Sequence, residues 1–133
     1  MSEEKKYKVL IVDDDEFLLN MYSVKFTKGG LEVFTSPSAD DAMRKLKEGL
    51  VPDAMIFDIV MPGTDGFELL ERVRKERLAS KAAIMFLTNQ GQSSDIERAK
   101  SLGAQGYIVK ASTIPSEVLG ELLKCLKLVQ EKK

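Results

Sequence analysis

The sequence predicts an α/β protein in which a five-stranded parallel sheet lies between helices on both faces. Five short apolar runs begin near residues 9, 31, 54, 83 and 107, and segments with helical periodicity separate them. A βα unit repeated in this way favours parallel strands covered by helices. Four of the runs end on Asp, Thr or Lys. In open sheets of this kind, ligands bind outside the carboxyl ends of the strands.

Length and composition fit one globular domain spanning residues 1–133. The 133 residues are 44% hydrophobic and 31% charged, and the net charge of −1 gives no global attraction to nucleic acid or to an anionic membrane. The absence of His removes the usual general base, the usual metal ligand and a His phosphocarrier role. Cys125 is the single cysteine, so the chain forms no internal disulfide and no thiolate metal cage.

The sequence also gives an expectation for location. No apolar run reaches the length of a membrane span, and the first residues, MSEEKKYK, lack the apolar core of a signal peptide. The last residues, QEKK, are too short for a second domain. We therefore expect a cytoplasmic protein that contacts neither membranes nor nucleic acid directly.

The first two predicted strands are each followed by an amphipathic helix. Val9–Val12 is fully apolar, which is typical of a strand buried on both faces, and we expect Asp15 to cap the following helix. Leu31–Phe34 gives a shorter strand, and Ser36 to Ser38 starts the second helix, which ends at Gly49. The inward positions of the two helices are Leu18, Leu19, Tyr22, Phe26, Ala39, Ala42, Met43 and Leu46.

The third strand, Ala54–Phe57, ends on Asp58 and is followed by turn residues. We interpret Asp65 and Gly66 as turn chemistry and a helix start rather than as catalytic residues. The next helix buries Phe67, Leu70 and Val73. Its basic face is expected to be solvated and consists of Arg72, Arg74, Lys75 and Arg77.

The last two strands also end on polar residues. Ala83–Leu87 runs into Thr88, and after a polar loop Ser93 or Ser94 caps a short fourth helix. Tyr107–Val109 ends on Lys110. Pro115 opens the final helix, whose inward positions are Leu119, Leu122, Leu123 and Leu126, with Cys125 packing beside them.

The polar strand ends predict a metal site. Because the carboxyl ends of parallel strands share one edge and adjacent strands are about 4.8 Å apart, Asp13, Asp14, Asp58, Thr88 and Lys110 can converge. Each carboxylate pair at about 5 Å costs roughly 3 kcal/mol at an effective dielectric near 20. Lys110 offsets part of this repulsion, and a divalent cation would offset more. Oxygen ligands of this kind match an octahedral Mg²⁺ that keeps several waters.

The same residues are suited to phosphoryl transfer. Asp58 can attack phosphorus as a carboxylate nucleophile, while Mg²⁺, Lys110 and Thr88 orient and neutralise the transferred oxygens. The product would be an acyl phosphate on Asp58. Its added charge would draw Thr88 and Lys110 inward and shift the loops that they anchor.

At these motifs the sequence resembles the receiver domain of two-component response regulators, in the stand-alone, CheY-like form. That family has an acidic pair after strand one, and a phosphoacceptor Asp followed by Met-Pro and then Asp-Gly. It also has a Thr after strand four, and a Lys after strand five with an aromatic residue three positions earlier. The resemblance covers about residues 7 to 130. The matching residues are Asp13, Asp14, Asp58, Met61, Pro62, Asp65, Gly66, Thr88, Tyr107 and Lys110.

The resemblance implies a flavodoxin-like fold with strand order 2-1-3-4-5 and a phosphorelay function. Asp58 would take phosphate from a sensor histidine kinase or a phosphotransfer protein, with Mg²⁺ held by Asp13, Asp14, Asp58 and the backbone carbonyl of Val60. Thr88 and Tyr107 would act as the switch. Output would pass through the face of helix four, strand five and helix five to an unidentified downstream protein. No output domain is expected, and catalysis would extend only to the protein's own phosphorylation and dephosphorylation.

Three departures from the family pattern affect the rim of the site. The family usually has Pro after its Lys, often with a cis bond, whereas Ala111 follows Lys110 here. Because a cis bond before a non-Pro residue costs about 3–4 kcal/mol, we expect either a trans bond with a reshaped loop or stored strain. Asn89 replaces a small residue and is expected to narrow access to the phosphoryl group. Val60 and Gln90 line the mouth, and Val60 offers no side-chain ligand.

Other functions of this fold class place different demands on the same residues. A phosphatase of the haloacid dehalogenase type needs a second Asp where Val60 stands, and a flavin or nucleotide carrier needs a phosphate-binding loop where residues 13–16 are acidic. A degenerate receiver that binds partners without phosphorylation stays open because of Asn89 and Ala111. Taken singly, the acidic pair could form a turn, Thr88 could cap a loop, Lys110 could be solvated and Tyr107 could simply pack.

Overall fold

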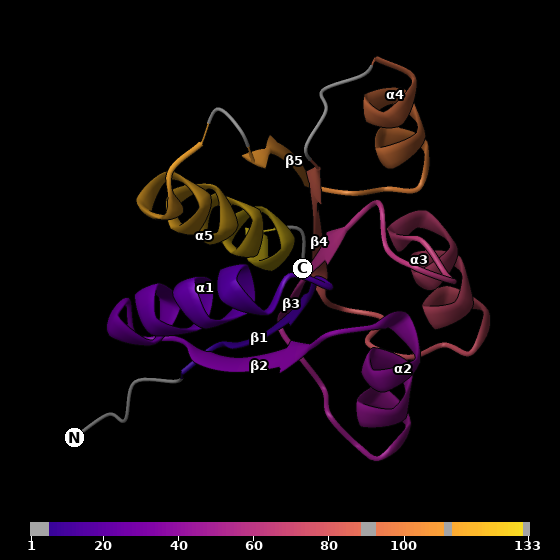
Figure 1. Cartoon of the computed structure of the whole chain (residues 1–133), viewed down its shortest axis with the longest axis horizontal. Coiled ribbons are helices and arrows are strands. Elements are labelled where there is room, and N and C mark those ends of the chain that lie inside the picture. The colour runs from indigo at the N-terminus through magenta and orange to yellow at the C-terminus, as the bar shows by residue number, and fades with distance from the viewer. Residues whose placement is uncertain (1–5, 89–92, 111–112, 132–133) are drawn as a thin grey trace.

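The computed structural model describes residues 6–88, 93–110 and 113–131. Strands and helices alternate through this part of the chain, as the sequence predicts (Figure 1). Their bounds are β1 Lys8–Val12, α1 Glu16–Lys28, β2 Glu32–Ser36, α2 Ala39–Lys47, β3 Ala54–Asp58, α3 Gly66–Lys75, β4 Ala83–Thr88, α4 Ser93–Ser101, β5 Gly106–Val109 and α5 Pro115–Glu131.

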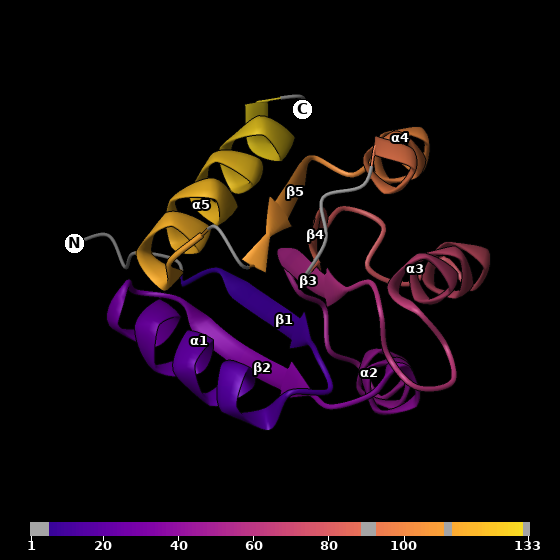
Figure 2. The same cartoon turned by 45° about the horizontal axis from the view of Figure 1, so that its top comes forward.

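The sheet is parallel and has the order β2-β1-β3-β4-β5, which confirms the predicted fold class. The register aligns the strand ends: Val12 pairs with both Ser36 and Phe57, and Thr88 pairs with Val109. Figure 2 shows β1 and β2 side by side with their arrowheads at the same end. Residues that immediately follow several strands therefore meet at one edge.

Helices cover both faces of the sheet and enclose two cores. α1 and α5 lie on one face, and α2, α3 and α4 on the other (Figure 1). β3 and β4 are buried along their whole length, which explains their nearly unbroken apolar sequences. On the α2–α4 face, Phe86 packs against Phe57 and Phe67 with ring centroids 6.1 Å and 4.8 Å apart.

Capping residues fix where α1 and α3 begin, close to the edge of the sheet at which the strands end. Asp15 is the N-cap of α1, as predicted, and its carboxylate accepts a hydrogen bond from the Leu18 amide at 3.2 Å. Asp65 caps α3 in a reciprocal capping box with Glu68. This arrangement confirms the interpretation of Asp65 and Gly66 as turn chemistry and a helix start.

Several local predictions were wrong at the ends of elements. Of the residues predicted to start α2, Ser38 is its N-cap and accepts a hydrogen bond from the Asp41 amide at 3.1 Å. Ser36 instead belongs to β2, because its carbonyl accepts a hydrogen bond from the Asp13 amide at 3.1 Å and extends the pairing of β1 with β2. α4 begins at Ser93, so Ser94 lies inside its first turn rather than at its N-cap. Leu123 is 44% exposed, because it is one helical step of about 100° from the buried Leu122.

The basic face of the third helix is largely solvated, as predicted, because Arg74, Lys75 and Arg77 are exposed and Arg72 is partly exposed. Arg74 donates a hydrogen bond to the Leu102 carbonyl, and Arg72 pairs with Asp40 at 3.3 Å. Arg77 lies beyond the end of α3 with φ of 58°. These contacts connect α3 to α2 and to Leu102, the residue that follows α4.

Two further observations concern the cysteine and the length of the helices. Cys125 is buried, and burial together with the charge of Glu121 raises the pKa of its thiol to about 11, which fits packing rather than redox chemistry. Among the described residues, no helix is long and apolar enough to cross a membrane.

Candidate functional site

Asp13, directly after β1, is completely buried and held by three hydrogen bonds. Its amide donates to the Ser36 carbonyl at 3.1 Å, and its Oδ1 accepts from the Asp15 amide at 2.9 Å. Its Oδ2 accepts from the Lys110 ammonium at 2.6 Å. The position of this carboxylate is therefore set by both strand pairing and side-chain contacts.

Asp58 ends β3 and is only 4% exposed. The chain beyond it folds back tightly: the Ile59 amide donates to the Leu87 carbonyl at 3.1 Å, and the Gly66 amide donates to the Ile59 carbonyl at 2.9 Å. A Cβ on Gly66 would lie 2.3 Å from the Asp58 carbonyl oxygen. The start of α3 can therefore approach the strand end only because residue 66 is glycine.

Lys110 joins the two buried acids. Its side chain is 8% exposed, and its Nζ lies 2.6 Å from Asp13 Oδ2 and 3.5 Å from Asp58 Oδ1. Burial lowers the pKa of Lys110, but the hydrogen bond and charge of Asp13, together with Asp58, outweigh burial and raise that pKa overall. The alternative of a solvated surface lysine is therefore wrong.

The three predicted carboxylates converge. One oxygen from each of Asp13, Asp14 and Asp58 lies within 4.8 Å of the others, with Asp14 exposed and the other two buried. Desolvation and the charge of Asp13 raise the pKa of Asp58 to about 7; Lys110 opposes this rise and Asp14 adds to it. The single positive charge of Lys110 therefore does not neutralise the three carboxylates. Three hard oxygen donors with one side open to water fit Mg²⁺, which retains waters when bound by few carboxylates.

The two proposed switch residues are in contact. Thr88 ends β4 and is 2% exposed. Tyr107 lies on β5 and is partly buried. Desolvation raises the pKa of Tyr107, the charge of Asp95 adds to this, and a side-chain hydrogen bond with Thr88 lowers it. The pair therefore connects the end of β4 to β5, while its role in switching stays a prediction.

Other predicted positions are less constrained by the structure. Val60 is 73% exposed, and metal binding by its carbonyl stays a prediction. Asn89, Gln90 and Ala111 lie outside the described residues. The expectations for access to the phosphoryl group and for the Lys110–Ala111 bond therefore stay predictions as well.

Two residues near the site were not identified as functional from the sequence. Ser36 holds the Asp13 amide through its carbonyl, a role that depends on strand register rather than on residue type. Tyr22 was predicted only as a core residue of α1, and it is buried. Burial raises the pKa of Tyr22, which also responds to the charges of Lys110, Asp13 and Asp58. No signal in the sequence distinguished it from other buried aromatic residues.

Comparison with known proteins agrees with this geometry. Residues 9–121 match the response regulator receiver domain family. The chain is 33% identical over 132 residues to the phosphate regulon transcriptional regulatory protein PhoB of Rhizobium meliloti (strain 1021), covering 89% of this chain and 58% of that protein. It is 35% identical over 114 residues to the probable chemotaxis protein CheY of Rhizobium etli, covering 86% and 88% respectively. The chain spans about half the length of the first curated relatives that it matches.

Solved structures show the same fold. Chemotaxis protein CheY4 of Vibrio cholerae superimposes with a TM-score of 0.83 at 30% identity, over 91% of this chain and 99% of that one. A CheY-like response regulator receiver domain protein of Methanospirillum hungatei JF-1 gives 0.86 at 26% identity, over 97% and 100%. The matched sequence, the strand order and the acids gathered beside a buried lysine agree, and this chain belongs to the response regulator receiver domain family.

Proposed function

We propose that this chain is a phosphoacceptor switch in which a phosphoryl group passes, with Mg²⁺ present, from a histidine kinase or a phosphotransfer protein to Asp58. The observation that carries the proposal is the placement of Lys110, whose Nζ lies 2.6 Å from Asp13 and 3.5 Å from Asp58 beside a third carboxylate. This arrangement offers a nucleophile, a fixed positive charge and a set of metal ligands at one rim.

The acids would hold the cation, and Lys110 and Thr88 would hold the phosphoryl group. Asp13, Asp14 and Asp58, with the carbonyl of Val60, would bind Mg²⁺, which supplies positive charge to the phosphoryl oxygens when bound. Lys110 and the Thr88 hydroxyl can each donate hydrogen bonds to those oxygens. The buried position of Lys110 strengthens this interaction, since water screens it little.

The transfer step exchanges one bond to phosphorus for another. A carboxylate oxygen of Asp58 attacks phosphorus, and the bond from phosphorus to the donor imidazole nitrogen breaks. The electron pair leaves with the imidazole, which takes up a proton from solvent, and an acyl phosphate remains on Asp58. Attack of water on phosphorus later restores the carboxylate and releases inorganic phosphate. In this proposal the chain catalyses only these reactions on itself.

The output would follow from the added charge. Phosphorylation brings negative charge that draws Thr88 and Lys110 inward, and the hydrogen bond between Thr88 and Tyr107 would carry the movement to β5. The face formed by α4, β5 and α5 would then bind a downstream protein differently. A cytoplasmic location is part of the proposal, because phosphohistidine donors are made from ATP inside the cell.

The test is phosphorylation of the intact chain. We expect incubation with Mg²⁺ and acetyl phosphate to add one phosphoryl group, detected by intact mass spectrometry, and we expect chelation of the metal to prevent it. Asp58→Asn is the control, since the amide is not a nucleophile. An adduct that survives this substitution, or no adduct on the wild-type chain, would reject the switch and favour a receiver that binds partners without phosphorylation.

A further inference from the structure

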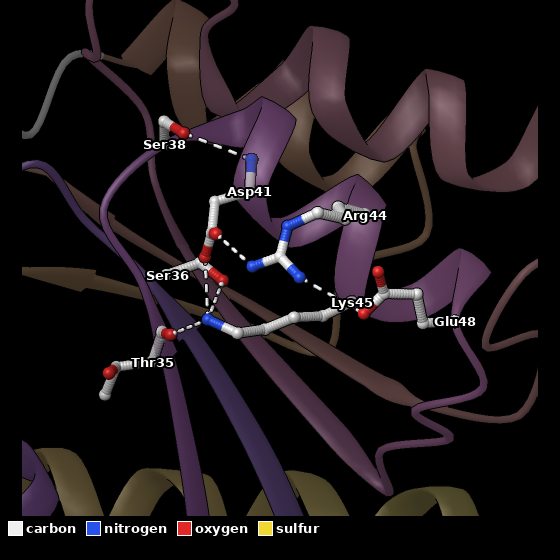
Figure 3. Close-up of polar contacts among 7 residues, drawn as sticks. All are labelled: Thr35, Ser36, Ser38, Asp41, Arg44, Lys45 and Glu48. Atoms are coloured by element: carbon white, nitrogen blue, oxygen red, sulfur yellow. Dashed lines mark hydrogen bonds and ion pairs between the residues drawn. The ribbon is translucent and has the colours of Figure 1, made fainter.

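A polar cluster at the start of α2 fixes the end of β2, outside the acidic site. The Lys45 ammonium donates to Asp41 Oδ2 at 2.6 Å and to Ser36 Oγ at 3.1 Å, and it also donates to the Thr35 carbonyl. Figure 3 shows the Lys45 side chain extending from α2 to these acceptors. An ammonium group has three donors, so Lys45 uses all of them here.

Ser36 connects this cluster to the functional rim. It is completely buried, its hydroxyl accepts from Lys45, and its carbonyl accepts from the Asp13 amide at 3.1 Å. Asp13 in turn accepts from Lys110 at 2.6 Å. Ser36 therefore links Lys45 on α2 to the backbone amide of Asp13, whose carboxylate lies at the predicted metal site.

The position of β2 explains why a lysine is needed there. β2 is the terminal strand in the order, so β1 lies on only one side of it. The Ser36 carbonyl points to β1, as its hydrogen bond with Asp13 shows, and the preceding carbonyl of Thr35 points the other way because successive carbonyls alternate. Lys45 supplies the partner that a further strand would otherwise give.

An ordinary surface ion pair does not account for these contacts. The exposed Arg44 also pairs with Asp41, at 2.6 Å, and with Glu48, at 3.1 Å, but both of these acids belong to the same helical turns. Its side chain is 55% exposed, against 28% for Lys45. Both cations pair with Asp41, and Lys45 also donates hydrogen bonds to two residues of β2.

We propose that Lys45, held by Asp41, is a positioning residue that fixes the end of β2 and, through the Ser36 carbonyl, the orientation of Asp13 for Mg²⁺. This inference rests on the proposed function, because it concerns the same metal site. Loss of Lys45 would leave the Thr35 carbonyl and the Ser36 hydroxyl without their charged donor. The strand end would then move more freely, and Asp13 with it.

The test compares Lys45→Met with Arg44→Met in the full chain without any phosphodonor. We expect Lys45→Met to weaken Mg²⁺ binding about threefold to tenfold, a smaller effect than loss of a residue that touches a metal ligand directly. Binding is followed by NMR shifts of amides around Asp13 during Mg²⁺ titration. We also expect a weaker hydrogen-bond scalar coupling between the Asp13 nitrogen and the Ser36 carbonyl carbon in the metal-free protein. Arg44→Met should leave both quantities unchanged.

Further variants keep the test decisive. If Lys45→Met does not fold, Ser36→Ala and Asp41→Asn replace it, and each should weaken Mg²⁺ binding by at least about twofold. Wild-type affinity and coupling in the folded variants would overturn the inference. Failure of the wild-type chain to accept phosphate would reject the proposed function alone, since Mg²⁺ binding and the coupling are measured without phosphorylation.

Discussion

Asp58 is poised between its two protonation states in the metal-free protein. Burial and the charge of Asp13 raise its pKa from 3.8 to about 7. At pH values between 3.8 and about 7, Asp58 holds a proton in the folded chain that it has released in the unfolded chain. The free energy of unfolding therefore falls as pH rises through this window. Above pH 7 the folded protein carries the full cost of the buried charge.

At the residue scale, we predict that Asp58→Asn stabilises the metal-free protein at pH 8 by roughly 2 to 4 kcal/mol. The amide has a similar shape and carries no charge, so the cost of burying an ionised carboxylate disappears. The advantage should shrink as pH is lowered toward 4, where Asp58 in the folded wild type is protonated. Urea unfolding across this pH range measures it.

A matched control is the exposed carboxyl of Glu32 on β2, since it makes no ion pair or side-chain hydrogen bond with the described residues. Glu32→Gln should change stability by less than about 0.5 kcal/mol at every pH. Equal stability of Asp58→Asn and the wild type at pH 8 would show that Asp58 is not strained by its neighbours.

The convergence of the acids with Lys110 could be predicted from the sequence, because parallel strands place their carboxyl ends at one edge. The cluster around Lys45 could not. Lys45 and Lys47 lie two residues apart on α2, and nothing in the sequence shows which of them reaches the end of β2. The difference lies in side-chain reach over the end of β2, which only the folded arrangement determines.

At the element scale, the approach of α3 to β3 depends on Gly66. A Cβ at this position would lie 2.3 Å from the Asp58 carbonyl oxygen and 3.1 Å from its carbon, and both are backbone atoms. We predict that Gly66→Ala destabilises the protein by about 1 to 3 kcal/mol, because the helix must shift away from the strand. Chemical denaturation measures the loss.

Gly120→Ala provides the comparison for that prediction. Gly120 lies within α5, and nothing lies within 4 Å of a Cβ built there. Alanine restricts the unfolded chain and favours helix, so this variant should gain about 0.5 to 1 kcal/mol. A Gly66→Ala variant as stable as the wild type would mean that the contact between α3 and β3 can relax without cost.

Element types were predicted better than element ends. The apolar runs and the 3.6-residue spacing identified the strands and helices, because burial on both faces or on one side imposes those patterns. The ends depend on individual hydrogen bonds. Ser36 looked like a helix start beside Pro37, yet pairing with β1 keeps it in the strand. Leu123 fitted an apolar stripe by spacing alone, but α5 presents Val118, Leu122 and Cys125 to the sheet instead.

At the scale of the whole molecule, the sheet separates two cores that share no side chains in the clusters on its faces. Val73 belongs to the core under α2 and α3, and Val118 to the core under α1 and α5. We predict that Val73→Ala and Val118→Ala each cost roughly 2 kcal/mol. The double variant should lose the sum of the two within about 0.5 kcal/mol.

Equilibrium unfolding in urea of the wild type, the two single variants and the double variant gives these free energies of unfolding. The comparison requires that the free energy falls with urea concentration at the same slope in all four proteins. A coupling energy above about 1 kcal/mol would mean that the sheet transmits packing changes from one face to the other. Additive losses would instead mean that core residues on one face of the sheet can be substituted without changing the packing on the other face. The face formed by α4, β5 and α5, which we propose binds a downstream protein, spans both layers, so the result bears directly on how it can move.

The repeat of βα units predicts parallel strands but leaves their order open, since any right-handed winding satisfies it. The order 2-1-3-4-5 followed from the resemblance to receiver domains, and the structure confirms it. The order matters for function because it makes β1 and β3 neighbours. Asp13 and Asp58 therefore lie at adjacent strand ends, close enough to share one ammonium.

Tyr22 gives the chain an internal chromophore. Its ring stacks on Phe26 with centroids 5.6 Å apart, and its ionisation responds to the same lysine and aspartates that surround the acidic rim. The chain has three tyrosines and no tryptophan. Near-ultraviolet absorption by this phenol, sensitive to the electric field across the ring, would report cation uptake without any attached label.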